Sequence, residues 1–173
     1  GVVKQASITL ESDGSWYVLF SCDNVPQILL PKTAVNIGID LGLKTFAMLS
    51  NEEKIEIPRF FKKTERKLVK AQRVLSERKR GSKRRFKARL QVARIHLKVR
   101  RTRSDFHHKE TLKLVKRFDK IAIEDLNVKS LIEKKPENQT KNKLAKSIHD
   151  AGWSQFISIL ALAKLKNYIA NYE

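Results

Sequence analysis

The stretch Asn36-Ile37-Gly38-Ile39-Asp40-Leu41-Gly42 is a short apolar run that ends in a carboxylate and a glycine. A second apolar run follows at residues 45–49, and residues 55–57 form a third after the polar turn at 51–53. Short runs of strand-forming residues separated by turn residues are typical of an antiparallel meander. The sequence therefore predicts three consecutive strands in this part of the chain.

Residues 120–126 repeat the pattern, because a few β-branched residues again lead to a carboxylate, Glu124. The long helical segment between the two runs predicts that their strands are parallel, and ligand sites in such sheets form at the carboxyl ends of the strands. Asp40 and Glu124 both fall at such ends. If the strands are neighbours, the two carboxylates lie within reach of one divalent cation such as Mg²⁺, which prefers oxygen ligands.

Two such ions, about 3.5–4 Å apart, can activate water and stabilise the leaving oxygen during phosphodiester hydrolysis. The alternative is that Asp40 and Glu124 only cap the loop or helix that follows each strand. Spacing alone favours this structural interpretation.

The segment between these strands has a helical period. Apolar residues recur on both sides of Gly81-Ser82, at Leu68, Ala71 and Leu75 before it and at Phe86, Leu90, Ala93 and Leu97 after it. This spacing predicts two helices that meet at Gly81 and form a hairpin over about residues 60–118, with a narrow apolar seam and basic outer faces. The second helix either ends near Ser104 and Asp105 or continues as one long helix.

The two ends of the chain have simpler patterns. Residues 2–10 and 16–20 flank the turn signal Ser12-Asp13-Gly14 and predict a β-hairpin, followed by a proline-containing connector at 22–32. Residues 133–143 are polar and predict an exposed loop. Apolar residues from Trp153 to Ala163 fall on one face of a final helix, where Trp153 and Phe156 are expected to lie in the core.

The charge of the chain is concentrated in one segment. The net charge is +19, and residues 59–117 contain 24 basic and 4 acidic residues, whereas the rest of the chain has 13 basic and 14 acidic. A polyphosphate is the partner that such a field suits best. An anionic membrane surface is a weaker candidate, because the apolar positions are sparse. The predicted phosphate contacts are Arg66, Lys67, Lys70, Arg73, Arg78, Lys79, Arg80, Lys83, Arg84 and Arg85.

Length and composition exclude several classes of protein. A chain of 173 residues with 41% hydrophobic and 32% charged residues is a folded domain, neither disordered nor multidomain. No apolar run approaches the about 20 residues of a membrane span. The single cysteine, Cys22, excludes both an internal disulfide and a cysteine-based zinc site within these residues. His107 and His108, adjacent on a helix, are expected to be surface residues that share no metal.

Three motifs closely resemble TnpB, the OrfB-type protein of insertion sequences. They are residues 36–47 (Asn-Ile-Gly-Ile-Asp-Leu-Gly-Leu-Lys-Thr-Phe-Ala), 121–127 (Ile-Ala-Ile-Glu-Asp-Leu-Asn) and 147–153 (Ser-Ile-His-Asp-Ala-Gly-Trp). They occur in the order and approximate spacing of that family, and the resemblance covers nearly all of residues 35–172. Gly-Ile-Asp-Leu-Gly alone would be weak, since it also occurs in unrelated ATPases.

The resemblance implies an α/β fold, namely an RNase H-like, RuvC-type mixed sheet with an inserted basic helical hairpin, preceded by a short β-hairpin. Residues 1–34 would be the end of a wedge-like barrel, and residues 35–173 a partial nuclease domain with Asp40 and Glu124 as metal-binding catalytic carboxylates for Mg²⁺ or Mn²⁺. Whole members of this family are RNA-guided DNA endonucleases, so a guide RNA and target DNA are the implied partners. The implied location is the cytoplasm of a prokaryote.

This chain also departs from the family pattern. The family continues with a cysteine-rich zinc-binding insertion and a third catalytic Asp, whereas this chain stops at Glu173. Asp150, within the third motif, is better interpreted as a helix N-cap. With two of three carboxylates, we expect weak metal binding at most and little or no cleavage by this polypeptide alone, whether it is an excised piece or a degraded transposon remnant.

Two functional hypotheses follow. The first is a partial RuvC-like nuclease domain from a transposon-encoded endonuclease. The second is a basic RNA- or DNA-binding protein without catalysis, in which Asp40 and Glu124 are structural. Titration with Mn²⁺ separates the two hypotheses.

Overall fold

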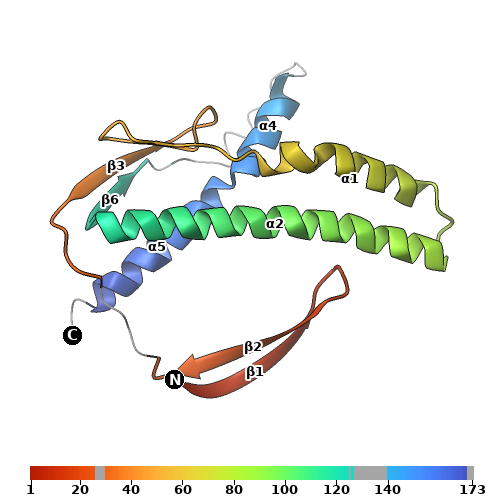
Figure 1. The fold of residues 1–173 in the computed structure, drawn as a ribbon, viewed down its shortest axis with the longest axis horizontal. Coiled ribbons are helices and arrows are strands. Elements are labelled where there is room, and N and C mark those ends of the chain that lie inside the picture. Colours follow the sequence, from red (N-terminus) through yellow and green to blue (C-terminus); the bar gives the residue numbers. More distant parts are fainter. Residues whose placement is uncertain (26–29, 125, 127–139, 171–173) are drawn as a thin grey trace. The chain divides into compact units, whose positions relative to one another are not determined.

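The computed structural model describes residues 1–25, 30–124, 126 and 140–170 (Figure 1). The chain divides into two compact units. The first contains residues 1–28 and 61–102, and the second contains residues 29–60 and 103–173. Among the described helices, none has an apolar segment of membrane-spanning length.

The second unit is built on a mixed sheet of four strands. Its strands are β3 (Asn36–Leu41), β4 (Ala47–Leu49), β5 (Lys54–Ile55) and β6 (Lys120–Ile123), in the order β5-β4-β3-β6. The first three form an antiparallel meander, and β6 pairs with β3 in parallel, from Asn36↔Lys120 to Ile39↔Ile123. The predicted meander and parallel crossover are therefore confirmed, although the third strand is shorter than the 55–57 segment predicted for it.

Helices cover one face of this sheet. Strand β3 alternates, because Ile37, Ile39 and Leu41 are buried whereas Asp40 is exposed. The buried face packs against apolar residues from the end of α2 (Lys83–Arg117), from α4 (Thr140–Ala151) and from α5 (Trp153–Ala170). The core residues contributed by the helices, and by Phe118 directly after α2, are Leu114, Val115, Phe118, Ile148, Ala151, Trp153, Phe156 and Leu160. Burying one face of the sheet leaves its polar side chains on the other.

Two charged contacts hold the ends of the strands in this unit. Asp119, just before β6, accepts hydrogen bonds from the backbone N–H groups of Thr33 (3.0 Å) and Ala34 (2.7 Å), at the entry to β3. Arg117 donates to both carboxylate oxygens of Glu53 in the β4–β5 turn, at 2.8 and 2.6 Å. These contacts connect the end of the crossover helix to both sides of the meander.

The first unit contains the predicted helical hairpin and β-hairpin. Helix α1 (Phe60–Ser76) turns at Gly81, whose φ of +81° favours glycine, into α2, which runs unbroken to Arg117. The prediction of two helices meeting at Gly81 is confirmed, and α2 is one long helix. Strands β1 (Val2–Leu10) and β2 (Trp16–Asp23) form the β-hairpin with antiparallel pairing, as predicted.

The apolar seam of α2 differs from the prediction. Leu97 is buried, but Phe86 is 52% exposed. The residues of α2 that line a groove with α1 are instead Ala88, Gln91 and Ile95. The helical spacing was identified, but the period alone does not determine which of two neighbouring stripes faces the partner helix.

The C-terminal helices confirm one prediction and correct another. Trp153 and Phe156 are buried in the core, as expected of the final helix. The predicted exposed loop at 133–143 lies partly outside the described residues, and its last part is wrong because α4 begins at Thr140. Asp150 lies in the last turn of α4 rather than in front of α5, which begins at Trp153, so the N-cap interpretation of Asp150 is not supported.

Candidate functional site

Asp40 and Glu124 lie at the same level of two hydrogen-bonded parallel strands. Ile39 is paired with Ile123, and each carboxylate belongs to the next residue along its chain. Neighbouring strands lie about 4.8 Å apart, and residues paired in register share a face of the sheet. Asp40 and Glu124 are both exposed, which places two carboxylates side by side on the face that the described helices leave open.

Small residues surround this pair along the strands. Gly38 is paired with Ala122, and each lies two residues before its acid on the same face of the sheet. Ser50 accepts a hydrogen bond from the Gly38 N–H through its Oγ at 3.2 Å, and its own N–H donates to the Gly38 carbonyl at 2.9 Å. The neighbours of the carboxylates along β3 and β6 are therefore small, whereas Met48 of β4 is paired with Asp40 on its other side.

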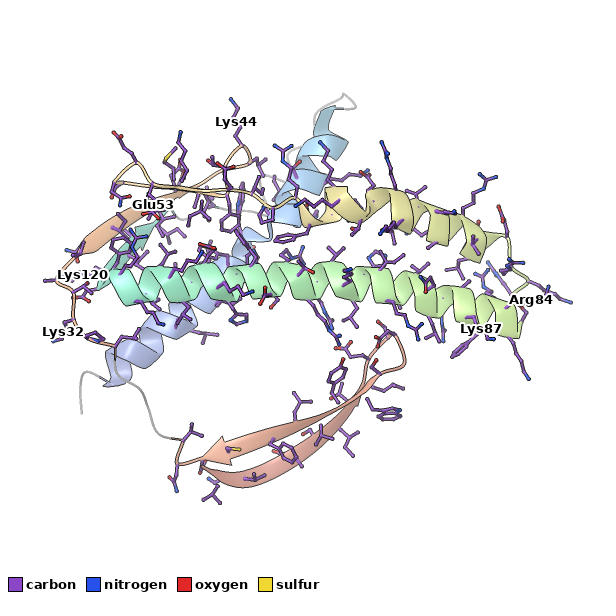
Figure 2. The ribbon with its side chains drawn as sticks, viewed as in Figure 1. Lys32, Lys44, Glu53, Arg84, Lys87 and Lys120 are labelled. Carbon is purple, nitrogen blue, oxygen red and sulfur yellow. The ribbon has the colours of Figure 1, made fainter. Side chains whose placement is uncertain are left out.

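A tight turn directly follows Asp40. The Gly42 N–H donates to the Phe46 carbonyl at 3.1 Å, and a Cβ at position 42 would lie 3.0 Å from the Thr45 carbonyl oxygen. This close approach explains why the carboxylate is followed by Leu-Gly. Lys44 is exposed in this turn and is labelled in Figure 2, and it forms no hydrogen bond or ion pair with Asp40.

The donor set of this site suits a hard cation. Two exposed carboxylates offer oxygen ligands and leave room for water, which is what Mg²⁺ and Mn²⁺ require. Within residues 1–25, 30–124, 126 and 140–170 no cluster of three or more His, Cys, Asp or Glu side chains could hold a metal. The described part of the chain therefore presents two carboxylates, without a third.

The predicted phosphate contacts all belong to the helical hairpin of the first unit. They lie on α1, on the turn around Gly81 and on the first turn of α2, and all are exposed except the half-buried Arg85. Figure 2 shows Arg84 and Lys87 near the start of α2. Most of these side chains make no ion pair or hydrogen bond with another described residue, so their charge is available to a ligand.

Two members of the set have partners within the chain. Arg73 forms an ion pair with Glu77, with 3.1 Å between Nε and Oε1. Arg85 donates from Nη1 to the carbonyl oxygens of Leu75 (2.9 Å) and Arg78 (3.0 Å). Arg85 therefore stabilises the end of α1 and the turn, and it is a structural residue first.

Sequence reasoning missed a buried polar cluster at the corner between α4 and α5. His107 was expected at the surface, but its side chain is fully buried and its Nε2 lies 2.9 Å from the Ala151 carbonyl oxygen. Arg103, one turn earlier on α2, donates to the His149 carbonyl at 2.7 Å. Burial lowers the pKa of His107 to about 4, so the imidazole is neutral and donates from Nε2.

This cluster explains the third sequence motif. Gly152 has a φ of +65°, and a Cβ there would lie 3.0 Å from Arg103 Cδ and 3.1 Å from His107 Cε1. The residues around it, Ala151 and Trp153, belong to the core. The motif therefore specifies a sharp corner between two helices, whose backbone carbonyl groups accept hydrogen bonds from two side chains of α2. His107 lies two helical turns before the buried Leu114, and this spacing could have indicated that His107 is buried.

Comparison with known proteins gives one family and several relatives. The OrfB_IS605 family model, described as "Probable transposase", matches residues 20–135. A "Putative RNA-guided DNA endonuclease" of Streptomyces pristinaespiralis is 36% identical over 159 residues, which cover 91% of this chain and 38% of the relative. The "Putative RNA-guided DNA endonuclease InsQ" of Escherichia coli (strain K12) is 30% identical over 173 residues, covering 95% of this chain and 43% of the relative.

A third relative extends the range of organisms. The "TnpB-like protein L79" of Acanthamoeba polyphaga mimivirus is 32% identical over 139 residues, which cover 76% of this chain and 27% of the relative. The chain therefore spans less than half the length of the curated relatives that it matches.

Proposed function

The chain belongs to the OrfB_IS605 family of TnpB-type proteins, and from this premise we propose that it carries part of a RuvC-like nuclease domain of an RNA-guided DNA endonuclease. The observation that carries the proposal is that Asp40 and Glu124 directly follow the last paired residues of the two strands, Ile39 and Ile123, so that continuing the register brings both exposed carboxylates together. Structural caps of two separate loops have no reason to meet at one level of one face.

The arrangement of the sheet supports an RNase H-like fold. Strands β3, β4 and β5 form an antiparallel meander, and β6 joins β3 in parallel after the helical crossover. Residues 35–173 would form the partial nuclease domain. Residues 1–34 would be the end of a wedge-like barrel, and the exposed apolar side chains of β1 and β2 support this, because an isolated two-stranded hairpin is marginal in water.

In this proposal Asp40 and Glu124 would hold Mg²⁺ or Mn²⁺. A bound ion would supply Lewis acidity for activating water and for neutralising charge on the scissile phosphate. The chain's own contribution is to place one carboxylate on β3 and the other directly after β6, with Gly38 and Ala122 leaving space along the two strands. The turn closed by Gly42 holds the end of β3 in place.

The nucleic-acid partners in this proposal are a guide RNA and its target DNA. The basic helical hairpin provides unpaired Lys and Arg side chains on α1, on its turn and at the start of α2. Neutralising phosphates with these side chains releases counterions and does not depend on base sequence. Base pairing with a guide RNA would supply the sequence specificity.

A non-catalytic nucleic-acid-binding role is the second candidate. The observation that favours it is the absence of a three-carboxylate cluster from the described residues. Two ligands hold a divalent ion weakly and position water poorly, so we propose that the 173-residue chain alone binds nucleic acid but cuts it slowly or not at all.

Titration of the isotope-labelled chain with Mn²⁺, followed by NMR, tests the site. We expect paramagnetic broadening centred on Asp40 and Glu124, its loss in Asp40→Asn, and its retention in Glu56→Gln, which removes an exposed carboxylate elsewhere in the same unit. Broadening scattered over many surface acids would refute the metal site. Efficient DNA cleavage by the wild-type chain that Asp40→Ala abolishes would refute its proposed inactivity.

A further inference from the structure

Helices α1 and α2 do not close along their whole length, and a groove of about 330 Å³ remains between them. It is lined by Lys67, Lys70, Ala71 and Val74 of α1 and by Ala88, Gln91 and Ile95 of α2. In each helix these residues follow the spacing of a single face. The groove is therefore a continuous feature of the two facing helix surfaces within the first unit.

The groove is open because its central residues are small. Ala71 and Ala88 project only a methyl group each, whereas Leu68 and Leu97, on the same helices, are buried. Beyond the groove, Arg85 ties the start of α2 to the end of α1 through two carbonyl groups. These two hydrogen bonds connect the helices at the turn, and the groove lies along their facing sides.

The lining combines an apolar floor with positive charge and one amide. Val74 and Ile95 add aliphatic surface to the two alanines, and Gln91 is the uncharged polar side chain of the lining. Lys67 and Lys70 are exposed and form no ion pair with any residue that the structure describes. An occupant must therefore bury an apolar surface and carry negative charge at its edge.

We propose that this groove binds one unstacked nucleotide of a single-stranded RNA or DNA segment. The base lies against the aliphatic floor, its flanking phosphates contact Lys67 and Lys70, and the amide of Gln91 hydrogen-bonds an edge of the base. A nucleotide matches this chemistry because a flat apolar face and a phosphate are present in the same unit. The inference rests on the proposed function in one respect, namely that nucleic acid is the partner of the basic helices.

The size of the groove argues against a protein helix as the occupant. Small-ligand pockets range over about 300–1,000 Å³, and this groove lies at the lower end. An amphipathic helix needs anchors at i, i+3 or i+4 and i+7, spread over two turns. A base paired within a duplex is excluded too, because its faces are covered by stacking. The ligand is therefore single-stranded or locally unpaired.

Binding of fluorescent oligonucleotides to the 173-residue chain tests the groove. The probes are a 12-nucleotide RNA, the same sequence as single-stranded DNA, and a DNA duplex. Ala71→Leu and Ala88→Leu fill the groove without changing charge, and Gln72→Leu adds an apolar side chain at an exposed position of α1 outside it. We expect the filling variants to bind single strands about tenfold more weakly, with duplex binding unchanged. The RNA and DNA arms show which strand supplies the nucleotide.

The salt dependence separates this inference from the proposed function. Filling the groove displaces only the base and leaves Lys67 and Lys70 exposed to the phosphates, so the slope of affinity against salt should stay the same, whereas Lys67→Ala should reduce it by about one phosphate contact. If the filling variants bind single strands as Gln72→Leu does, the groove is not a nucleotide site, although salt-dependent binding by the basic surface stands. If the wild-type chain binds none of the probes, the nucleic-acid role of the hairpin fails as a whole.

A second measurement uses the wild-type chain, so its result does not depend on whether the variants fold. The side-chain amide signals of Gln91 in the wild-type chain should shift when the single-stranded probe is added and stay in place when the duplex is added. Unchanged Gln91 signals at saturating single strand would overturn the proposal. A shift caused equally by an acidic amphipathic peptide that competes with the oligonucleotide would overturn it in favour of a protein partner.

Discussion

Lowering the pH should destabilise the second unit through one side chain, His107. Its imidazole is fully buried beside Phe46, Phe106 and Phe156, with ring-centroid distances of 5.6, 5.9 and 5.8 Å. Burial is the largest cause that lowers its pKa from 6.5 to about 4, and the positive charge of Arg103 lowers it further. The hydrogen bond to the Ala151 carbonyl opposes this shift without cancelling it.

The sign and size of the effect follow from proton linkage. Between pH 6.5 and about 4 the unfolded chain binds a proton at His107 and the folded chain does not, so the free energy of unfolding falls as the pH falls. The gap between the two pKa values corresponds to about 3 kcal/mol when fully expressed. The contribution is fully present above pH 6.5 and is lost as the pH falls to about 4.

Urea unfolding of the chain at several pH values between 7.5 and 4.5 measures this contribution. His107→Gln keeps an N–H donor for the Ala151 carbonyl but does not titrate, so its stability should depend less on pH than that of the wild type, by up to about 3 kcal/mol across the range. His108→Gln, at an exposed neighbouring position, should retain the wild-type dependence. Identical curves for the wild type and His107→Gln would refute the reasoning.

Three further outcomes follow from the described contacts. Gly152→Ala should lower the melting temperature by about 4 °C or more, because a left-handed φ costs about 1–2 kcal/mol for alanine and its Cβ would approach Arg103. A melting temperature within one degree of the wild type would contradict this. Arg85→Met should speed amide hydrogen exchange in the turn at residues 77–82, because it removes the hydrogen bonds to two backbone carbonyl groups. Arg84→Met should not, and equal exchange rates in the two variants would show that Arg85 does not stabilise the turn. Glu53→Gln should weaken the ion pair with Arg117 at neutral pH and make little difference at low pH, because the hydrogen bonds from Arg117 lower the pKa of Glu53. Thermal unfolding at both pH values checks this, and an equal loss of stability at both would argue against it.

The sheet could be predicted because its signals are local. The short apolar runs separated by turn residues, and the repeated run at 120–123 after a long helical segment, were sufficient to predict the meander and the parallel pairing. Register in a parallel pair is then constrained by burial, because a slip of one residue would turn Ile39 outward and Asp40 into the core. The proximity of Asp40 and Glu124 follows from the same constraint.

The remaining features depend on tertiary contacts that the periodicity does not contain. His107 is a polar residue and suggests a surface position. It is buried because the α4–α5 corner presents a backbone carbonyl group that needs a hydrogen-bond donor. Phe86 has the period of a core residue, yet it is exposed, and Arg89 lies over its ring with 5.3 Å between Cζ and the centroid. Each assignment requires knowing what lies opposite the helix.

Arg85 shows why a count of basic residues overstates a phosphate-binding surface. In the sequence Arg85 cannot be told apart from Arg84. Its guanidinium, however, already donates hydrogen bonds to two carbonyl groups, and these bonds would have to break before it could reach a phosphate. Arg103, Arg100 and Arg117 are likewise bonded within the chain, to a helix end or to a carboxylate. The surplus charge of the helices therefore divides into arginines that hold the fold and a set dominated by lysines and turn arginines that remains open to a ligand. A salt titration should count only the second set, and for this reason its slope tests the structure as well as the proposed function.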